Sequence, residues 1–222
     1  NSTTFAQGPA SNWYFGLRAG IRFDNLEPNT LLDSEMRAFE GCTSYSSESG
    51  NLLFYSNGDT VWNRNHQPMP NGTGLQGHPS ATQSVAFCQL PNTNSKYFIF
   101  TTDGFDLNVG LRYSVIDMDL DGGLGDIVVG QKNIIVLDSV TEKLGIIEKC
   151  DKSGYWVITN QTLGNTIFTY SIDSNGLDTN ANVSQGQISY SSLGAKFGYL
   201  RISSKGNYVA LCHEMKHKVE LF

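Results

Sequence analysis

The sequence predicts an all-β fold, and within that class three observations favour a β-propeller. Short apolar runs of the β type recur along the 222-residue chain, and Gly, Ser or Asn residues introduce each of them. The runs return at a spacing of roughly 45 to 60 residues, the length of one propeller blade of three or four antiparallel strands. No segment has a sustained helical periodicity, since the nearest candidate, residues 31–39, is short and leads directly into a predicted strand.

The first unit, residues 40–84, contains the clearest hairpin. A strand is predicted at 51–56, bounded by Ser-Gly and Asn-Gly. The next strand is predicted at 60–63, after a turn in which Gly58 can adopt a positive φ. A preceding strand at 42–45 completes the unit.

Three further units repeat this order of a first, a central and a third strand. The first strands are predicted at 84–89, 144–149 and 199–203, the central strands at 96–101, 155–159 and 207–212, the third strands at 112–117, 166–172 and 218–222, and fourth strands at 133–137 and 185–190. Stacked blades can bury faces that a single blade leaves exposed. The competing prediction is a β-sandwich built from a long series of hairpins.

We interpret residues 1–222 as one partial propeller domain of about three and a half blades. Because the chain ends inside a predicted third strand, we expect the domain to continue further. Residues 12–16 and 20–23 are expected to pair with the missing last blade. Residues 1–11 are interpreted as an N-terminal tail that carries a signal-peptide remnant cut after Ala6, and the alternative is an ordinary disordered terminus.

Composition limits the classes of function. The net charge is -6 with a pI near 5.1, and no cluster of Lys and Arg is visible, so nucleic acid is not an expected partner. Only 16% of the residues are charged, against 23 glycines and abundant Asn, Ser and Thr, which suits an exported protein. No apolar run approaches the roughly 20 residues that a membrane-spanning helix needs.

Four cysteines, Cys42, Cys88, Cys150 and Cys212, lie far apart in the sequence. None has the short spacing of a zinc knuckle or of a redox Cys-x-x-Cys motif. We interpret them as buried small apolar residues at strand positions, and the alternative is one or two disulfides formed in an oxidising compartment.

Several short motifs occur in a defined order over most of the chain. They are NWYFG at 12–16, EGC at 40–42, GNLLFY at 50–55, NRNH at 63–66, MPNG at 69–72, SATQS at 80–84, YFIFT at 97–101, DMDLDGGLG at 117–125 and EKL at 142–144. In these motifs the sequence resembles the propeller region of large Bacteroidetes surface proteins that end in a gliding-motility-associated, type IX secretion sorting domain. The resemblance implies a propeller at the cell surface, exported through a sorting domain that lies outside these residues.

His213, Glu214 and His217 form an H-E-x-x-H sequence. In zinc proteases this spacing puts two histidines on one face of a helix, where they bind the metal while the glutamate acts as a base. The flanking segments, 206–212 and 218–222, are β-type runs. We therefore expect a hairpin loop here, and zinc binding by His213 and His217 is the alternative.

Asp117, Asp119 and Asp121, followed by Gly122, resemble the opening of a calcium loop. The twelfth position is Val128, where an EF-hand carries a bidentate glutamate. We expect a polar turn between the third and fourth strands of a blade, with aspartates accepting backbone hydrogen bonds. Calcium binding by the three aspartates is the alternative.

The loop at 63–82 is long for a hairpin connection. Long polar loops at one end of a propeller often form a binding face, so Trp62, His66 and His78 are candidate ligand contacts, and a glycan could meet Trp62 or Tyr55. The alternative is that the loop only shapes the crossing between two blades, with the aromatic rings in the core.

These patterns predict a non-enzymatic, secreted binding module of a larger exported protein with a protein or glycan partner, and the resemblance implies an adhesive or gliding-related role. No catalytic residue and no cofactor are assigned, and no Gly-x-Ser-x-Gly motif is present. The alternative is an exported hydrolase, or a carbohydrate-active or lectin propeller, with its site in loops around a central channel.

Overall fold

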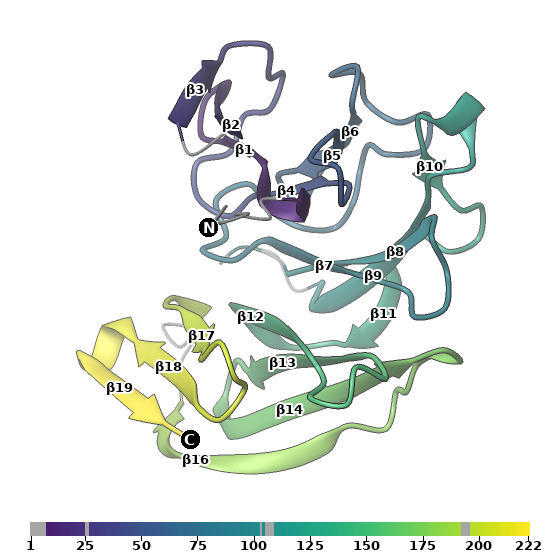
Figure 1. The fold of residues 1–222 in the computed structure, drawn as a ribbon. Helices are drawn as coiled ribbons and strands as arrows, with labels where there is room; N and C mark the ends of the chain where they lie inside the picture. The colour runs from purple at the N-terminus through teal and green to yellow at the C-terminus, as the bar shows by residue number, and fades with distance from the viewer. Residues whose placement is uncertain (1–7, 25–26, 103, 105–108, 192–195) are drawn as a thin grey trace, which may run out of the picture.

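The computed structural model describes residues 8–24, 27–102, 104, 109–191 and 196–222, and it is an all-β structure (Figure 1). In this part of the chain the strands form five antiparallel sheets of three to five strands, and each sheet uses strands that are consecutive in sequence. The predicted all-β class is confirmed. Five successive sheets do not match the two facing sheets of a β-sandwich.

The sheets follow one another along the chain. The two N-terminal sheets contain β1 (Asn12–Phe15), β2 (Ala19–Asp24) and β3 (Glu27–Leu31), then β4 (Thr43–Ser46), β5 (Leu52–Ser56) and β6 (Val61–Asn63). The two central sheets contain β7 (Val85–Gln89), β8 (Lys96–Thr101), β9 (Leu111–Asp117), β10 (Asp126–Ile127) and β11 (Ile134–Leu137), then β12 (Val140–Glu148), β13 (Tyr155–Gln161), β14 (Gly164–Asp173), β15 (Gly176–Leu177) and β16 (Asn182–Tyr190). The C-terminal sheet contains β17 (Leu200–Ile202), β18 (Val209–His213) and β19 (Lys218–Leu221). Short 3-10 turns lie at η1 (Gly8–Ala10), η2 (Asp121–Gly123) and η4 (Glu214–Lys216).

Every strand predicted in the four units overlaps an observed strand, because alternating apolar residues and turn residues are local signals. The hairpin between β5 and β6 turns at Gly58, whose φ is 91°, as predicted. The largest difference is in β12, which begins at Val140 and not at Leu144. The register between β12 and β13 shifts between these two residues, so a bulge extends the strand through a polar stretch.

The N-terminal segment forms a sheet of its own, which the sequence analysis did not predict. β1 and β2 pair with each other, and β2 pairs with β3. Within the described residues these local pairings occupy both edges of β2, and pairing of this segment with a further blade stays a prediction. β3 escaped prediction because it is an exposed edge strand with little apolar pattern and with Pro28 in it.

The interpretation of residues 1–11 as a tail is wrong for residues 8–11. Gly8–Ala10 form η1, Ser11 is buried, and the Asn12 side chain donates hydrogen bonds to Ser46 Oγ and Gly50 O, each at 2.9 Å. These contacts fasten the start of β1 to the next sheet. The candidate cut after Ala6 lies outside the described residues.

Each hydrophobic cluster lies between two consecutive sheets. Between the second and third sheets, for example, Phe54 packs against Tyr97 and Ile99, and Tyr45 and Phe87 flank this cluster. Similar clusters join the first sheet to the second, the third to the fourth and the fourth to the fifth. The sheets are therefore stacked in chain order, and both faces of the central sheets are covered.

The first strands of four successive sheets lie side by side. β4 is next to β7, β7 next to β12, and β12 next to β17, while β1 lies beside β4 (Figure 1). These strands are end members of their sheets and form no ladder with one another. Gly145 permits β12 to lie close to β17, because a Cβ at this position would lie 2.4 Å from Leu200 Cδ2.

Replacement of Trp62 tests the stacked core. Trp62 is 8% exposed, so Trp62→Ala should lower the free energy of unfolding by about 3 to 5 kcal/mol, measured by denaturant titration with circular dichroism. Trp13→Ala is the matched control. Because Trp13 is 50% exposed, its replacement should lower the free energy of unfolding much less. Equal losses at the two positions would contradict this account.

Candidate functional site

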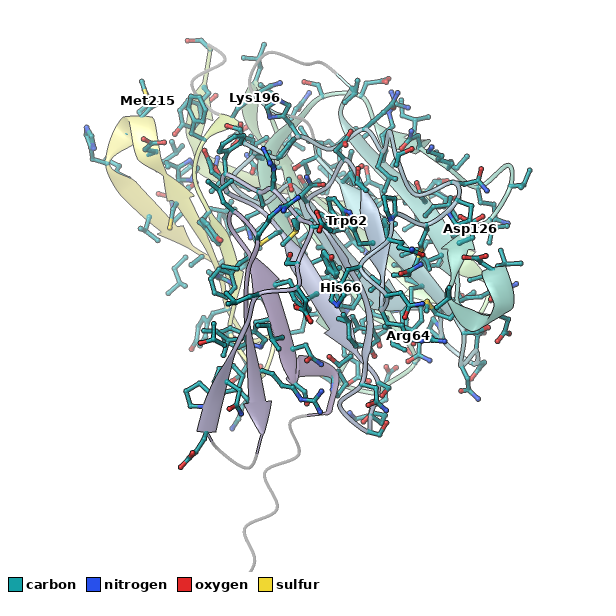
Figure 2. All side chains as sticks on the ribbon, turned by 90° about the horizontal axis from the view of Figure 1, so that it is seen from above. Trp62, Arg64, His66, Asp126, Lys196 and Met215 are labelled. Atoms are coloured by element: carbon teal, nitrogen blue, oxygen red, sulfur yellow. The ribbon has the colours of Figure 1, made fainter. Side chains whose placement is uncertain are left out.

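Trp62, predicted as a ligand contact, is part of the core (Figure 2). Its ring stacks on Tyr55 with centroids 5.4 Å apart, and Tyr55 stacks on Tyr14 at 4.7 Å. Trp62 is 8% exposed and Tyr55 is fully buried. The expectation that a glycan contacts these rings is therefore corrected, because neither ring has a solvent-exposed face on which a sugar could stack.

His66 and His78 hold the local structure and do not converge with Trp62 on a shared pocket. His66 Nδ1 lies 3.3 Å from the Tyr55 hydroxyl, and its Nε2 lies 3.2 Å from Asp33 Oδ2. His78 Nδ1 accepts a hydrogen bond from Ser80 N within its own turn. The predicted ligand loop thus uses its histidines as structural hydrogen-bonding groups.

The loop at 63–82 is fastened to the third sheet. Asp126 accepts hydrogen bonds from Asn71 N at 2.7 Å and Asn71 Nδ2 at 2.6 Å, and Arg64 donates to Gly123 O (Figure 2). These side chains join segments more than fifty residues apart. The alternative interpretation, a crossing between two sheets, is the one that the contacts support.

The aspartates at 117, 119 and 121 form the predicted polar turn. Asp117 ends β9, and its Oδ1 accepts a hydrogen bond from Asp119 N at 3.0 Å. Asp117 Oδ2 also lies 3.7 Å from Lys96 Nζ. Asp121 begins η2 with a positive φ of 50°. The turn leads first to β10, a two-residue strand that was not predicted, and the fourth strand predicted at 133–137 follows as β11; both pair with β9.

The H-E-x-x-H sequence lies in the predicted hairpin connection. β18 ends at His213, η4 covers the next three residues, and β19 begins after His217, whose φ is 50°. His213 is 3% exposed, whereas His217 is exposed. A single 3-10 turn with histidines in such different surroundings is unlike the α-helical face that zinc proteases use. Within the described ranges, no three His, Cys, Asp or Glu side chains gather closely enough to hold a metal ion.

His213 joins the fourth and fifth sheets. Its Nε2 lies 2.8 Å from Glu220 Oε2, and its ring stacks on Tyr190 with centroids 5.7 Å apart. The other oxygen of Glu220 accepts hydrogen bonds from Gln187 N and Ile188 N on β16. Burial lowers the pKa of His213, and the positive charge of Lys143 lowers it further. The negative charge of Glu220 raises this pKa, but the lowering effects are larger.

The four cysteines are free thiols and differ in burial. Cys88 is buried, and this burial raises the pKa of its thiol. Cys42 and Cys212 are partly buried, in agreement with packing at strand positions. The prediction is wrong for Cys150, which is exposed in the turn after β12.

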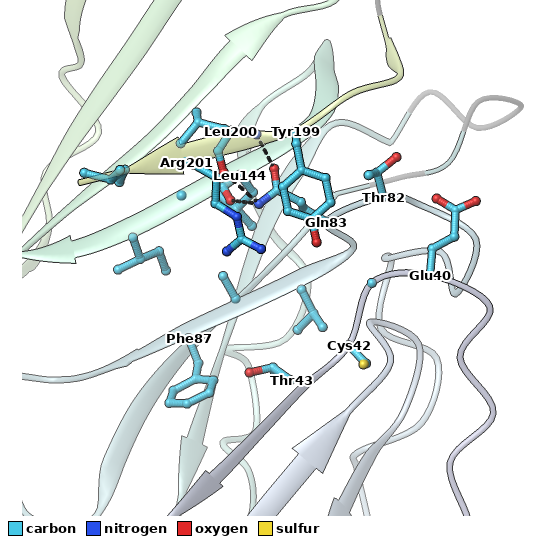
Figure 3. Close-up of a pocket in the computed structure, with 16 residues that line it drawn as sticks. Glu40, Cys42, Thr43, Thr82, Gln83, Phe87, Leu144, Tyr199, Leu200 and Arg201 are labelled. Carbon is cyan, nitrogen blue, oxygen red and sulfur yellow. Dashed lines mark hydrogen bonds between the residues drawn. The ribbon is translucent and has the colours of Figure 1, made fainter. Parts of the chain in front are cut away.

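A cavity of about 460 Å³ lies where the four first strands meet (Figure 3). Its lining comes from residues 40–43, 82–83, 85–87, 144–146 and 199–202. These residues belong to, or directly precede, β4, β7, β12 and β17. This volume lies within the range of about 300 to 1,000 Å³ that small-molecule sites occupy.

The amide of Gln83 connects three sheets at this cavity (Figure 3). Its Nε2 donates to Leu144 O at 3.0 Å and to Leu200 O at 3.1 Å, while its Oε1 accepts from Leu200 N at 2.7 Å. The side chain therefore pairs with the free edge of β17 as the backbone of an adjacent strand would. Gln83 is the polar link that fixes the positions of β12 and β17 beside β7.

Arg201 and Tyr199 flank Leu200 and present a cation to the cavity. The guanidinium carbon of Arg201 lies 4.6 Å from the centroid of the Tyr199 ring. Both residues line the cavity, and both are solvent-exposed. Stacking on an aromatic face restricts the guanidinium while leaving its N–H groups available.

Ionisable residues are buried beside the same strand ends. Glu142 is 1% exposed, and its Oε2 accepts hydrogen bonds from Thr82 N and Thr82 Oγ1, each at 2.8 Å. Burial raises the pKa of Glu142 despite these bonds. Burial also lowers the pKa of Lys143 to about 8. Lys196, 2% exposed, donates to Gly104 O at 3.2 Å (Figure 2).

Sequence reasoning missed all the polar residues of this cavity. Gln83 gave no signal, because its partners lie 61 and 117 residues away. Arg201 and Tyr199 looked like ordinary residues of a short strand. Glu142 and Lys143 lie outside the lining and directly precede the predicted strand at 144–149, where charged residues are ordinary, so they gave no signal either.

No family model, curated protein or solved structure matches this chain. A search of the described residues finds no helix with the length and apolar character needed to cross a membrane.

Replacement of Gln83 tests the link between the sheets. Gln83→Ala should lower the free energy of unfolding by about 2 to 4 kcal/mol, because three hydrogen bonds are lost. Gln83→Glu keeps the volume but places a carboxylate opposite two carbonyl oxygens, so a similar loss is expected. Denaturant titration measures both. Gln131→Ala, at an exposed position, should change stability by less than about 0.5 kcal/mol, and an equal effect at both positions would contradict the assignment.

Titration of the histidines tests the surroundings of His213. We expect its pKa below 6.5, because burial disfavours the charged imidazole. The unfolded chain then binds a proton more readily than the folded chain, so this residue contributes stability above pH 6.5 that is lost on acidification. NMR titration measures the pKa, with His213→Gln to assign the signal and exposed His217 for comparison. A pKa above 6.5 would show that Glu220 dominates.

Proposed function

We propose that this chain is part of an exported β-propeller at the cell surface and acts there as a non-enzymatic binding module. The observation that carries the proposal is the side-by-side placement of β4, β7, β12 and β17 around one cavity. Innermost strands of propeller blades surround a central channel in the same manner. Each of these strands begins a separate antiparallel sheet, which is the chain order expected of blades.

A binding role is favoured by the chemistry of the cavity. Its lining combines polar groups, among them Gln83, Tyr199 and Arg201, with apolar side chains such as Phe87. In ligand sites apolar surface supplies contact area, and converging polar groups fix the orientation of the ligand. The partner would be a glycan or a protein surface met outside the cell.

Export and surface location rest on composition and on the resemblance to Bacteroidetes surface proteins. The low charged fraction and abundant Asn, Ser, Thr and Gly suit an exported chain. Contact with the type IX secretion machinery would be made by a sorting domain outside these residues. An adhesive or gliding-related role follows from the same resemblance.

A hydrolase is the second candidate, and one observation favours it. Glu142, with its raised pKa, lies in the strand beside Lys143, whose pKa is lowered to about 8. Ionisable groups with shifted pKa values often mark catalytic sites, although structural networks shift them too. Glu142 would then be the proton donor for cleavage of a sugar or ester.

One pair of assays separates the two functions. The protein is screened on a glycan array and against chromogenic glycosides and esters, together with Thr43→Trp, which narrows the cavity, and Val129→Trp, at an exposed turn. Binding without turnover, lost in Thr43→Trp and kept in Val129→Trp, is the expected result. Turnover abolished by Glu142→Gln would favour the hydrolase. A glycan array with no hits would count against a glycan-binding module.

A further inference from the structure

We infer that the cavity at the four first strands binds an acidic oligosaccharide, with the Arg201 guanidinium receiving a sugar carboxylate. The inference rests on the proposed binding function and adds the chemical class of the ligand. It is carried by one juxtaposition: a cation held on an aromatic ring beside hydroxyl and apolar groups of the same cavity.

The charge of Arg201 is oriented and available. The guanidinium lies over the Tyr199 ring at 4.6 Å and projects toward the cavity in Figure 3. No described residue forms an ion pair with it. A planar guanidinium can bind a carboxylate through two parallel hydrogen bonds, a geometry that an ammonium group cannot reproduce. Stacking on Tyr199 reduces the side-chain entropy that such binding would otherwise lose.

The remaining lining suits a sugar better than a flat apolar ligand. Phe87 and Ile146 contribute apolar surface, against which the C–H face of a sugar ring can pack. Thr43 contributes a hydroxyl group that can donate or accept hydrogen bonds with sugar hydroxyls, and the Thr82 oxygen, whose hydrogen is donated to Glu142, can accept one. The volume of about 460 Å³ is enough for a short oligosaccharide segment.

The overall charge of -6 does not oppose an acidic ligand at this point. Charges separated by more than about 8 Å of solvent are largely screened at physiological ionic strength. The charged groups close to the cavity therefore determine whether an acidic ligand is attracted or repelled. Among the described residues of the lining, Glu40 supplies the anionic group, and Figure 3 places it well away from Arg201. The cationic end of the cavity is therefore electrostatically distinct from its anionic rim.

A matched pair of ligands tests the inference. Calorimetry measures binding of tetragalacturonate and of its fully methyl-esterified form, which keeps the sugar but removes the charge. The acid should bind at least about tenfold more tightly than the ester, and its affinity should fall as sodium chloride rises. Arg201→Gln should weaken binding of the acid by about tenfold without changing the ester, and Arg201→Lys should give an intermediate loss.

Lys205→Gln is the control variant, because it removes one exposed positive charge from the turn between β17 and β18, outside the lining. Its affinity for the acid should stay within about twofold of the parent protein. Equal binding of acid and ester, unaffected by Arg201→Gln, would overturn the acidic class while leaving the binding function intact. Binding of neither tetrasaccharide would overturn the inference even if other glycans bind. Arg201-dependent binding of tetraglutamate without tetragalacturonate would point to an acidic peptide and overturn the sugar assignment.

Discussion

The unpaired edges of the first strands are the constraint on which the rest of the structure depends. Strand edges expose N–H and C=O groups that need partners, yet β7, β12 and β17 lie side by side without forming a common ladder. Gln83 meets this need with an amide that bonds to Leu144 and to both backbone groups of Leu200. The cavity exists because the strands are joined by a side chain and remain separate sheets.

The same link places the residues that face the cavity. Tyr199 and Arg201 are the immediate neighbours of Leu200, so fixing the backbone at Leu200 also fixes where their side chains emerge. The stacked pair then presents a cation with little freedom. Glu142 is held in a comparable way by two bonds from Thr82, the residue before Gln83. One short segment thus positions ionisable groups on two other sheets.

The elements that the sequence predicted well are those with local causes. Gly58 has the positive φ that its turn requires, and the predicted strand at 96–101 coincides with β8. Prediction failed where the deciding contacts were distant. The loop at 63–82 looked like a ligand-binding loop, but Asp126 and Asn71 fasten it to the next sheet across 55 residues. Trp62 was predicted to contact a ligand, but its ring is buried and stacked on Tyr55.

By itself, the sequence determined the all-β class and, in the four repeated units, the order of the main strands and their turns, because alternation of apolar residues and the backbone preferences of glycine act over a few residues. Only the tertiary structure decided which side chains share a site. Gln83, Leu144 and Arg201 line one cavity from the segments of three different sheets, and the local sequence around each of them does not indicate the other two. Contacts between sheets depend on how the sheets stack, and that arrangement follows from packing over the whole chain.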